Sequence, residues 1–308
     1  MGKASNMESG PYRALFSGDM DVEGMEEILQ LYRDLFPLSG QALKPAREYR
    51  MPTGEEVSMR LEEGFTLLQP EDLMPSTEEV YRTAIEVMGI LSRHSDREEA
   101  MGMLAEEVKR EEFLPSLVAL YLRGGEESLR AEIGSDPRVD PELCLFLIFN
   151  IVKGSFRENG RVLAEVSLTP WEKETCPVCG GVPAVAYLSG EEGQRHLVCH
   201  RCEARWRFTR IQCPFCGNRD HETLGYFTLE GGDPILRVDF CEECGKYIKS
   251  WDVRQREDLL PEYEDLKSIS YDMAAEEEGY RRGAPNIFGV WVNFGRPGDE
   301  NAEADREA

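Results

Sequence analysis

The chain has 308 residues, a formal net charge of −24 at pH 7 and a sequence pI near 4.6. So acidic a surface repels nucleic acid and anionic membranes, and it suits solubility and contact with basic proteins. The start has no apolar core, and the longest apolar run, Leu143 to Phe149, is too short to cross a bilayer. We therefore expect no signal peptide and no membrane span.

The first half of the chain is predicted to be helical. Apolar residues recur three to four positions apart over residues 22–36, and this helix is expected to end at Pro37. A second helix is expected to begin after Ser76. There Ser76 and Glu79 are spaced as a capping box, in which each side chain bonds the other residue's backbone N–H.

The central region continues this helical pattern. A helix is predicted from about residue 97, interrupted or restarted at Pro115 and ended by Gly124-Gly125. Asp140-Pro141 is a typical helix start, with Asp140 as N-cap. The helix that follows, residues 143–152, is apolar nearly all round, which predicts the central buried helix of a bundle. Cys144 lies on it and is interpreted as a buried small hydrophobic residue.

The pattern changes near residue 167 to short alternating runs separated by turns that contain glycine. Two hairpins are predicted, one from residues 184–188 and 196–198 and the other from 223–229 and 235–240. A helix is predicted to return over residues 262–282, and the charged segment past Gly298 is predicted to be disordered.

Eight of the nine cysteines fall into four Cys-x-x-Cys pairs in the second half of the chain. Two residues between cysteines let both sulfurs of one tight turn reach the same metal ion, and two such turns complete a tetrahedral site. The pairs therefore predict two metal sites of four sulfurs each. They are Cys176/Cys179, Cys199/Cys202, Cys213/Cys216 and Cys241/Cys244.

Each proposed site has the same order of parts: a Cys-Pro-x-Cys-Gly turn, a hairpin and a second Cys-x-x-Cys turn. This order is typical of rubredoxin-like and zinc-ribbon modules, and it favours sequential pairing of neighbouring turns. A cross-brace, in which the first turn pairs with the third, stays open as the alternative. Four-sulfur ligation suits iron and zinc alike, so we expect two ions, iron or zinc, one per site. A closed site has no free coordination position, which makes a structural role the default.

Other side chains carry weaker signals. Four thiolates on a divalent ion leave a charge of about −2. Arginines near the pairs could offset it, namely Arg201, Arg205, Arg207 and Arg210. His196 and His200 are interpreted as bystanders, because the cysteines already complete both sites. The sequence has no phosphate-binding loop, nucleophile elbow or histidine-rich site with an open position, so we expect no catalytic residue and no enzymatic activity.

The string Cys-His-Arg-Cys-Glu-Ala-Arg-Trp at residues 199–206 is followed by Arg-Ile-Gln-Cys-Pro-Phe-Cys at 210–216. Together with the turns at 176–180 and 241–249, it closely resembles the family of formate dehydrogenase accessory proteins, FdhE. Residues 265–286 also look like that family's C-terminal helix. The resemblance covers about residues 171–288, whereas the helical first half and the acidic tail contain no motif that can be matched.

This resemblance implies a cytoplasmic accessory protein that binds the catalytic subunit of formate dehydrogenase during maturation or quality control. The eight paired cysteines are implied as metal ligands, and iron in a rubredoxin-like fold is the family's proposed arrangement. No nucleic-acid or membrane partner is expected, and self-association is left open. Two other functions compete: a rubredoxin-like electron carrier, and a zinc-ribbon nucleic-acid-binding protein, which the charge disfavours.

Taken together, the sequence predicts an α+β multidomain protein. Its parts are an α-helical domain at residues 1–166, a tandem four-cysteine rubredoxin-like or zinc-ribbon module at 167–252, and a C-terminal helix at 253–290 that packs back on the helical domain. Residues 291–308 are predicted to form a disordered tail.

Overall fold

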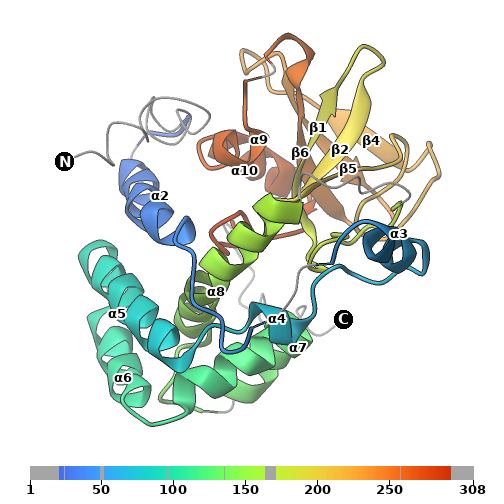
Figure 1. Ribbon diagram of the computed structural model, residues 1–308. Coiled ribbons are helices and arrows are strands. Elements are labelled where there is room, and N and C mark those ends of the chain that lie inside the picture. Colours follow the sequence, from blue (N-terminus) through green and yellow to red (C-terminus); the bar gives the residue numbers. More distant parts are fainter. Residues whose placement is uncertain are drawn as a thin grey trace.

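The computed structural model describes residues 21–23, 25–48, 52–95, 97–134, 136–163, 171–256 and 258–292. Helices from the first half of the chain lie beside a mixed β-sheet from the second half, so the fold is α+β, as predicted (Figure 1). Buried side chains from the helices and the sheet form one continuous hydrophobic cluster. None of the helices in these ranges is long and apolar enough to cross a membrane.

The helical layer is arranged around one central helix. Its members are α2 (Glu26–Ser39), α3 (Glu55–Glu62), α4 (Pro70–Leu73), α5 (Thr77–His94), α6 (Glu98–Val108), α7 (Phe113–Ile133) and α8 (Pro141–Leu163). Helix α8 packs against α2, α5 and α7, and nearly every side chain over residues 143–152 is buried, which confirms the predicted central helix. Asp140 caps it as expected, because its carboxylate accepts a hydrogen bond from the Leu143 N–H at 2.9 Å.

Three local predictions in this layer need correction. Helix α2 continues through Pro37 to Ser39, since Phe36 and Ser39 are buried and the Ser39 hydroxyl donates to the Phe36 carbonyl. Gly125 (φ 70°) does interrupt α7, as predicted, but a second helical segment that was not predicted follows to Ile133, because Leu129 and Ile133 are again buried in the core. Ser76 does cap α5, but the Glu79 carboxylate pairs with an arginine on the next turn instead of reaching back.

The second half forms one sheet rather than two separate ribbons. Its strands are β1 (Pro183–Ser189), β2 (Gln194–Cys199), β3 (Arg205–Arg207), β4 (Leu224–Phe227), β5 (Leu236–Cys241), β6 (Lys246–Asp252) and β7 (Arg281–Arg282). The order is β3-β2-β1-β6-β5-β4, with β7 beside β6. Both predicted hairpins form, as β1–β2 and β4–β5. Parallel pairing of β1 with β6 joins the two units.

The segment predicted as one helix over 262–282 is divided. A short 3₁₀ turn (Val253–Gln255) leads into α9 (Pro261–Glu264) and α10 (Ile269–Glu277), and β7 follows. The Lys249 ammonium donates to the carbonyls of Asp265 and Ser268, both at 3.0 Å. Those carbonyls therefore accept from a side chain instead of from the backbone N–H groups of one continuous helix. Helix α9 packs on β1 and α10 on β5 and β7.

Beyond β7 the chain returns to the helical layer. The Asn286 amide donates to the Tyr32 hydroxyl of α2 at 2.9 Å, and the Phe288 ring stacks on Tyr32 with centroids 5.2 Å apart. The predicted domain limits stay predictions: residues 164–170, which contain the boundary at 166, and most of the tail, residues 293–308, lie outside the described residues.

Four buried charges hold α10 and β7 to the sheet. Lys249 contacts the carboxylates of Asp265 at 2.8 Å and Asp272 at 2.7 Å, and Arg282 contacts the same two at 2.6 and 2.9 Å. All four side chains are nearly inaccessible to solvent. Tyr247 adds a hydrogen bond from its hydroxyl to Asp272 at 2.7 Å. Two cations and two carboxylates are thus balanced inside the protein, where an unpaired charge is costly.

This network predicts a loss of stability in acid. Burial alone would raise the pKa of the Asp265 carboxyl, but Arg282 and Lys249 outweigh burial and lower that pKa. A carboxyl whose folded pKa lies below its unfolded value of about 3.9 stabilises the fold above that value. We expect the free energy of unfolding to fall as the pH drops below about 4 and towards the folded pKa. Urea titrations at a series of pH values measure this free energy. In Lys249→Met it should depend less steeply on pH. An unchanged slope in that variant would contradict the assignment.

Candidate metal centres

The eight paired cysteines come together in two clusters, and each joins neighbouring turns. One cluster contains the turns at 176–179 and 199–202, the other those at 213–216 and 241–244, and within each all four sulfurs lie within 4.8 Å of one another. This is the sequential pairing, and it replaces the cross-brace alternative. The clusters are called site 1 and site 2 below.

The sulfur geometry fits a tetrahedral metal ion. In site 1 the Sγ atoms of Cys176 and Cys202, and those of Cys179 and Cys199, are 3.5 Å apart. In site 2 the corresponding separations between sulfurs are 3.7 and 3.8 Å. A zinc–sulfur bond of about 2.3 Å in a tetrahedron places its sulfurs about 3.8 Å apart, whereas a disulfide needs about 2.05 Å. Both clusters could therefore hold an ion of zinc or iron size without rearrangement.

The backbone conformation of the four turns is suited to thiolate ligands. In the first turn of each site an N–H two residues after the leading cysteine donates to its sulfur at 3.4 Å, from Val178 to Cys176 and from Phe215 to Cys213. Such donors stabilise a thiolate. The residue after the closing cysteine has a positive φ in all four turns. It is glycine in three of them, Gly180, Gly217 and Gly245, and Glu203 in the fourth.

Glu203 is the site residue that the sequence did not reveal. A non-glycine residue at φ 58° is strained, which costs about 1 kcal/mol. Its carboxylate contacts the Lys153 ammonium at 2.9 Å and the Arg157 guanidinium at 3.1 Å, both from α8. Burial alone would raise the pKa of Glu203, but the two cations outweigh burial and lower it. The sequence signal was a lysine and an arginine four residues apart, directly after the apolar run of α8.

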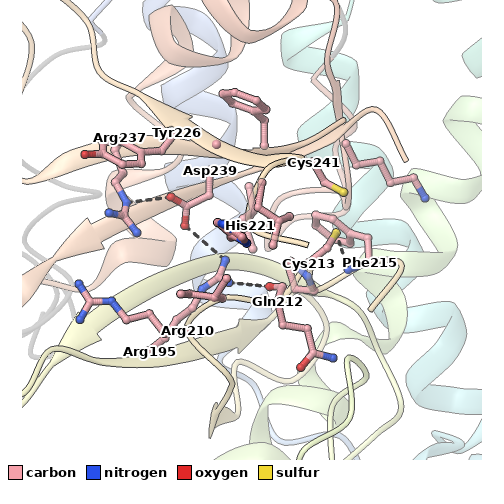
Figure 2. A pocket seen from close by; sticks show the side chains of 17 residues that line it. Arg195, Arg210, Gln212, Cys213, Phe215, His221, Tyr226, Arg237, Asp239 and Cys241 are labelled. Carbon is pink, nitrogen blue, oxygen red and sulfur yellow. Dashed lines mark hydrogen bonds and ion pairs between the residues drawn. The ribbon is translucent and has the colours of Figure 1, made fainter. Parts of the chain in front are cut away.

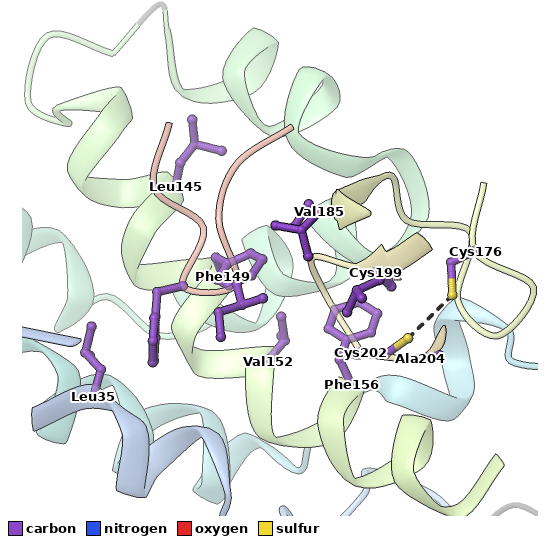
Figure 3. Close-up of a cluster of buried hydrophobic side chains, with 14 of the residues drawn as sticks. Leu35, Leu145, Phe149, Val152, Phe156, Cys176, Val185, Cys199, Cys202 and Ala204 are labelled. Atoms are coloured by element: carbon purple, nitrogen blue, oxygen red, sulfur yellow. Dashed lines mark hydrogen bonds between the residues drawn. The ribbon is translucent and has the colours of Figure 1, made fainter. Parts of the chain in front are cut away.

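Helix α8 holds the second turn of site 1 directly (Figure 3). The Lys153 ammonium donates to the carbonyls of His200 and Arg201, at 3.2 and 2.9 Å, between the two cysteines of that turn. Two turns of helix further on, Gly160 lies so close that an added Cβ would be 2.1 Å from the Cys202 carbonyl oxygen. The first turn is bound by the N-terminal half as well, through Leu67 N–H to the Pro177 carbonyl at 2.9 Å.

The two sites therefore differ in burial. Three cysteines of site 1 are buried and Cys179 is half-buried, because helices cover this cluster. Site 2 lies farther out on the sheet, with Cys216 exposed and Cys244 half-buried. Its turns are contacted by the C-terminal segment instead, where the Arg281 N–H donates to the Gly245 carbonyl at 2.8 Å.

Of the arginines predicted to balance the thiolates, Arg201 alone is placed to do so for site 1. Its guanidinium lies over the Tyr121 ring, and although burial by itself would lower its pKa, Tyr121 and the sulfurs of site 1 raise it. Arg205 instead pairs with Glu262 at 2.6 Å, and Arg207 lies beside Gln194. His200 bonds the Val182 carbonyl at 2.8 Å and is no member of either cluster.

Replacing Glu203 tests how site 1 is attached to the helices. Glu203→Gln leaves Lys153 and Arg157 without their carboxylate, so we expect the free energy of unfolding to fall by about 3 kcal/mol. In Glu203→Gly the free energy of unfolding should fall by about 1 kcal/mol less than in Glu203→Gln, because glycine adopts the positive φ without strain. Urea denaturation measures both, with the exposed Glu191→Gln on the β1–β2 turn as a neutral control. Equal stability of Glu203→Gln and the control would contradict this role.

Cys144 lies outside both clusters and is fully buried on α8, as the apolar helix predicted. Burial raises the pKa of its thiol to about 12. Only about one thiol in ten thousand is then ionised at pH 8, and the thiolate is the reactive form. We expect Cys144 to stay unmodified by iodoacetamide in folded protein and to react after denaturation, as mapped by mass spectrometry. Modification in the folded state would show that the helix opens.

Comparison with known proteins identifies the region around both sites. Residues 175–210 match the family model described as the central domain of FdhE, and residues 211–288 match the model of the FdhE C-terminal domain. An FdhE homologue from Aquifex aeolicus is 36% identical over 122 residues, which are 39% of this chain and 43% of that protein. One from Cronobacter sakazakii is 30% identical over 118 residues, 38% of each chain. The matched segment thus spans about two fifths of these relatives.

The helical half of the chain is also similar to a known protein, in its fold. The crystal structure of the FdhE protein from Pseudomonas aeruginosa superposes with a TM-score of 0.57 at 21% sequence identity, covering 87% of this chain and 90% of that one. This match shares the architecture of a helical layer beside a sheet. Together the two family models include both four-cysteine sites and the segment that contacts site 2. Residues 175–288 are thus similar to the central and C-terminal domains of FdhE, and the fold over 87% of the chain is similar to that of an FdhE protein.

Proposed function

We propose that this chain is an accessory protein that binds the catalytic subunit of formate dehydrogenase in the cytoplasm during its maturation, and that it catalyses no reaction itself. The similarity of residues 175–288 to the central and C-terminal domains of FdhE is the observation that carries the proposal. A molecule of this kind needs a rigid binding surface more than a reactive centre. The continuous core between helices and sheet supplies such rigidity.

As part of this proposal, each cluster binds one metal ion, iron or zinc, through its four cysteines. The ion's contribution is to cross-link two turns that have little hydrophobic core of their own. In site 1 the cross-linked turns also carry the contacts to α8, so the ion there fixes the sheet against the helices. Elemental analysis of gently purified protein should find two metal ions per chain, and one or none would contradict this part.

The partner is tested by capture and by activity. The tagged chain, expressed in a host that makes formate dehydrogenase, should retain the catalytic subunit in pull-down. Deleting the chain's gene in its own host should lower formate oxidation without abolishing synthesis of that subunit. Cys213→Ser should lose both the subunit and one metal ion, whereas Cys144→Ala, a buried cysteine outside both sites, should retain both. Normal formate oxidation in the deletion strain would rule out the proposal.

Electron transfer at site 2 is a second candidate function. The exposure of Cys216 supports it, because electron exchange with a partner needs a short path from the metal to the surface. The alternative requires iron, which zinc cannot replace since it has no second oxidation state. A visible absorption band that bleaches reversibly with dithionite would favour it. A colourless protein containing zinc would exclude it.

A further inference from the structure

A cleft of about 360 Å³ lies beside site 2, between the β4–β5 hairpin on one side and β2 with the 210–215 loop on the other (Figure 2). Its upper wall follows the sheet register, in which Tyr226, Asp239 and Ile248 form one row across β4, β5 and β6. Cys213 and Cys241 of site 2 form part of its wall. The cleft is thus built on the same rigid turns as the metal site.

The charge of the cleft is opposite to that of the whole chain. Four basic side chains line it against one carboxylate, Asp239, in a chain of net charge −24. They are Arg195, Arg210, Arg237 and Lys246. Asp239 is shared by Arg237 at 2.8 Å and Arg195 at 3.3 Å. No carboxylate of the described part of the chain pairs with Arg210 or Lys246. An anion entering the cleft therefore meets basic groups that the protein itself does not neutralise.

The thiolates of site 2 account for only part of this excess. A metal ion with four thiolates would leave a charge of about −2 beside Arg195 and Lys246. Arg210 and Arg237 come from farther along the cleft wall, and Arg210 is exposed. Counting all these charges, +4 from the basic groups, −1 from Asp239 and about −2 from the thiolates, the cleft still carries about +1.

Arg195 shows that the cleft has unused hydrogen-bonding capacity. Its side chain is buried, with 4% of its surface exposed. It donates to the Gln212 carbonyl at 2.9 Å and to Asp239, but its Nε has no partner. A buried donor without an acceptor is unfavourable, so the positive charge of this guanidinium is only partly compensated by its present partners.

The rim of the cleft is apolar and lies on a strand edge. Ile211 and Tyr226 are 57% and 64% exposed, two of the few large hydrophobic side chains that are so open to solvent. Strand β4, which carries Tyr226, pairs with β5 only, and its other side meets no strand within residues 171–256 and 258–292. A free strand edge beside side-chain pockets is how extended peptides are bound.

We propose that this cleft binds an extended protein segment in which a carboxylate side chain alternates with an apolar one. The carboxylate contacts Arg210 and Arg237, and the apolar side chain covers Ile211 and Tyr226. The proposal adds a recognition site to the protein and holds whichever partner supplies the segment. Charge complementarity favours an acidic peptide, and the exposed rim favours a peptide over a free anion.

The test uses the full chain with both metals bound and a fluorescein-labelled peptide of eight residues that alternates glutamate and leucine. Fluorescence anisotropy should show saturable binding, and no binding of the peptide that alternates lysine and leucine. The double variant R210Q/R237Q should raise the Kd about tenfold or more. R123Q/R138Q removes two exposed arginines outside the cleft and should leave the Kd unchanged.

Arg210→Glu is the second variant, since it changes an exposed side chain without disturbing Asp239, and it should abolish binding. Circular dichroism and metal content establish that each variant is folded. Three outcomes would overturn the proposal: no binding of the acidic peptide, equal Kd in the cleft and control variants, or displacement of the peptide by an equal concentration of inorganic phosphate. The last would mean that the cleft binds small anions rather than a peptide.

Discussion

Replacing Cys199 by serine is expected to remove one metal ion and to unfold most of the molecule. Cys199 is a buried member of site 1, whose turns are bonded to both α8 and the N-terminal half. A structural four-sulfur site contributes on the order of 10 kcal/mol to folding, which is comparable to the whole stability of a typical domain. Elemental analysis and circular dichroism of Cys199→Ser should show one ion and a large loss of helix and sheet signal together.

Site 2 supplies the matched comparison. Cys216→Ser also removes one ligand and one ion, but Cys216 is exposed and site 2 is not bonded to α8. We expect local unfolding of the 213–244 region with the helical signal largely retained. Urea denaturation should therefore rank the variants as Cys144→Ala, Cys216→Ser and Cys199→Ser in order of falling stability. Equal helical content in both serine variants would show that site 1 does not connect the two layers.

Asp272→Asn is expected to lower the free energy of unfolding by about 3–5 kcal/mol. Its carboxylate contacts both Lys249 and Arg282 and accepts a hydrogen bond from Tyr247. The neutral amide leaves two buried cations with the single carboxylate of Asp265, an uncompensated charge at a position without solvent. Because these residues attach α10 and β7 to the sheet, the C-terminal segment should detach first. Urea denaturation measures the loss, and hydrogen exchange shows where it begins.

The exposed Asp220→Asn is the control for that variant, as it removes the same charge from the same half of the chain. It should change stability by only a few tenths of a kcal/mol, as is usual for exposed charges. The loss of stability in Asp272→Asn should be partly reversed by also replacing Lys249 with methionine, because one buried cation and one buried carboxylate then remain. A double variant no more stable than Asp272→Asn would contradict the charge argument.

Local patterns in the sequence were sufficient for the two four-cysteine clusters and for most helices. The spacing within Cys-x-x-Cys and the hairpin between two such turns involve residues near one another in the chain, so their geometry is determined locally. Asp140, Ser76 and the apolar run at 143–152 behave as expected for the same reason. The predictions that were wrong concern Pro37 and the helix over 262–282, where buried contacts outweighed local preference.

The sequence by itself determined the four Cys-x-x-Cys turns and the central helix, and it favoured the pairing of neighbouring turns, which the structure confirmed over the cross-brace. Only the tertiary structure decided the parallel pairing of β1 with β6, the strained φ of Glu203 beneath α8, and the basic cleft between the two hairpins. These features join residues that are tens of positions apart, such as Lys153 with Glu203 and Arg195 with Asp239. No local periodicity specifies such a pair, because each partner's burial depends on how the rest of the chain folds around it.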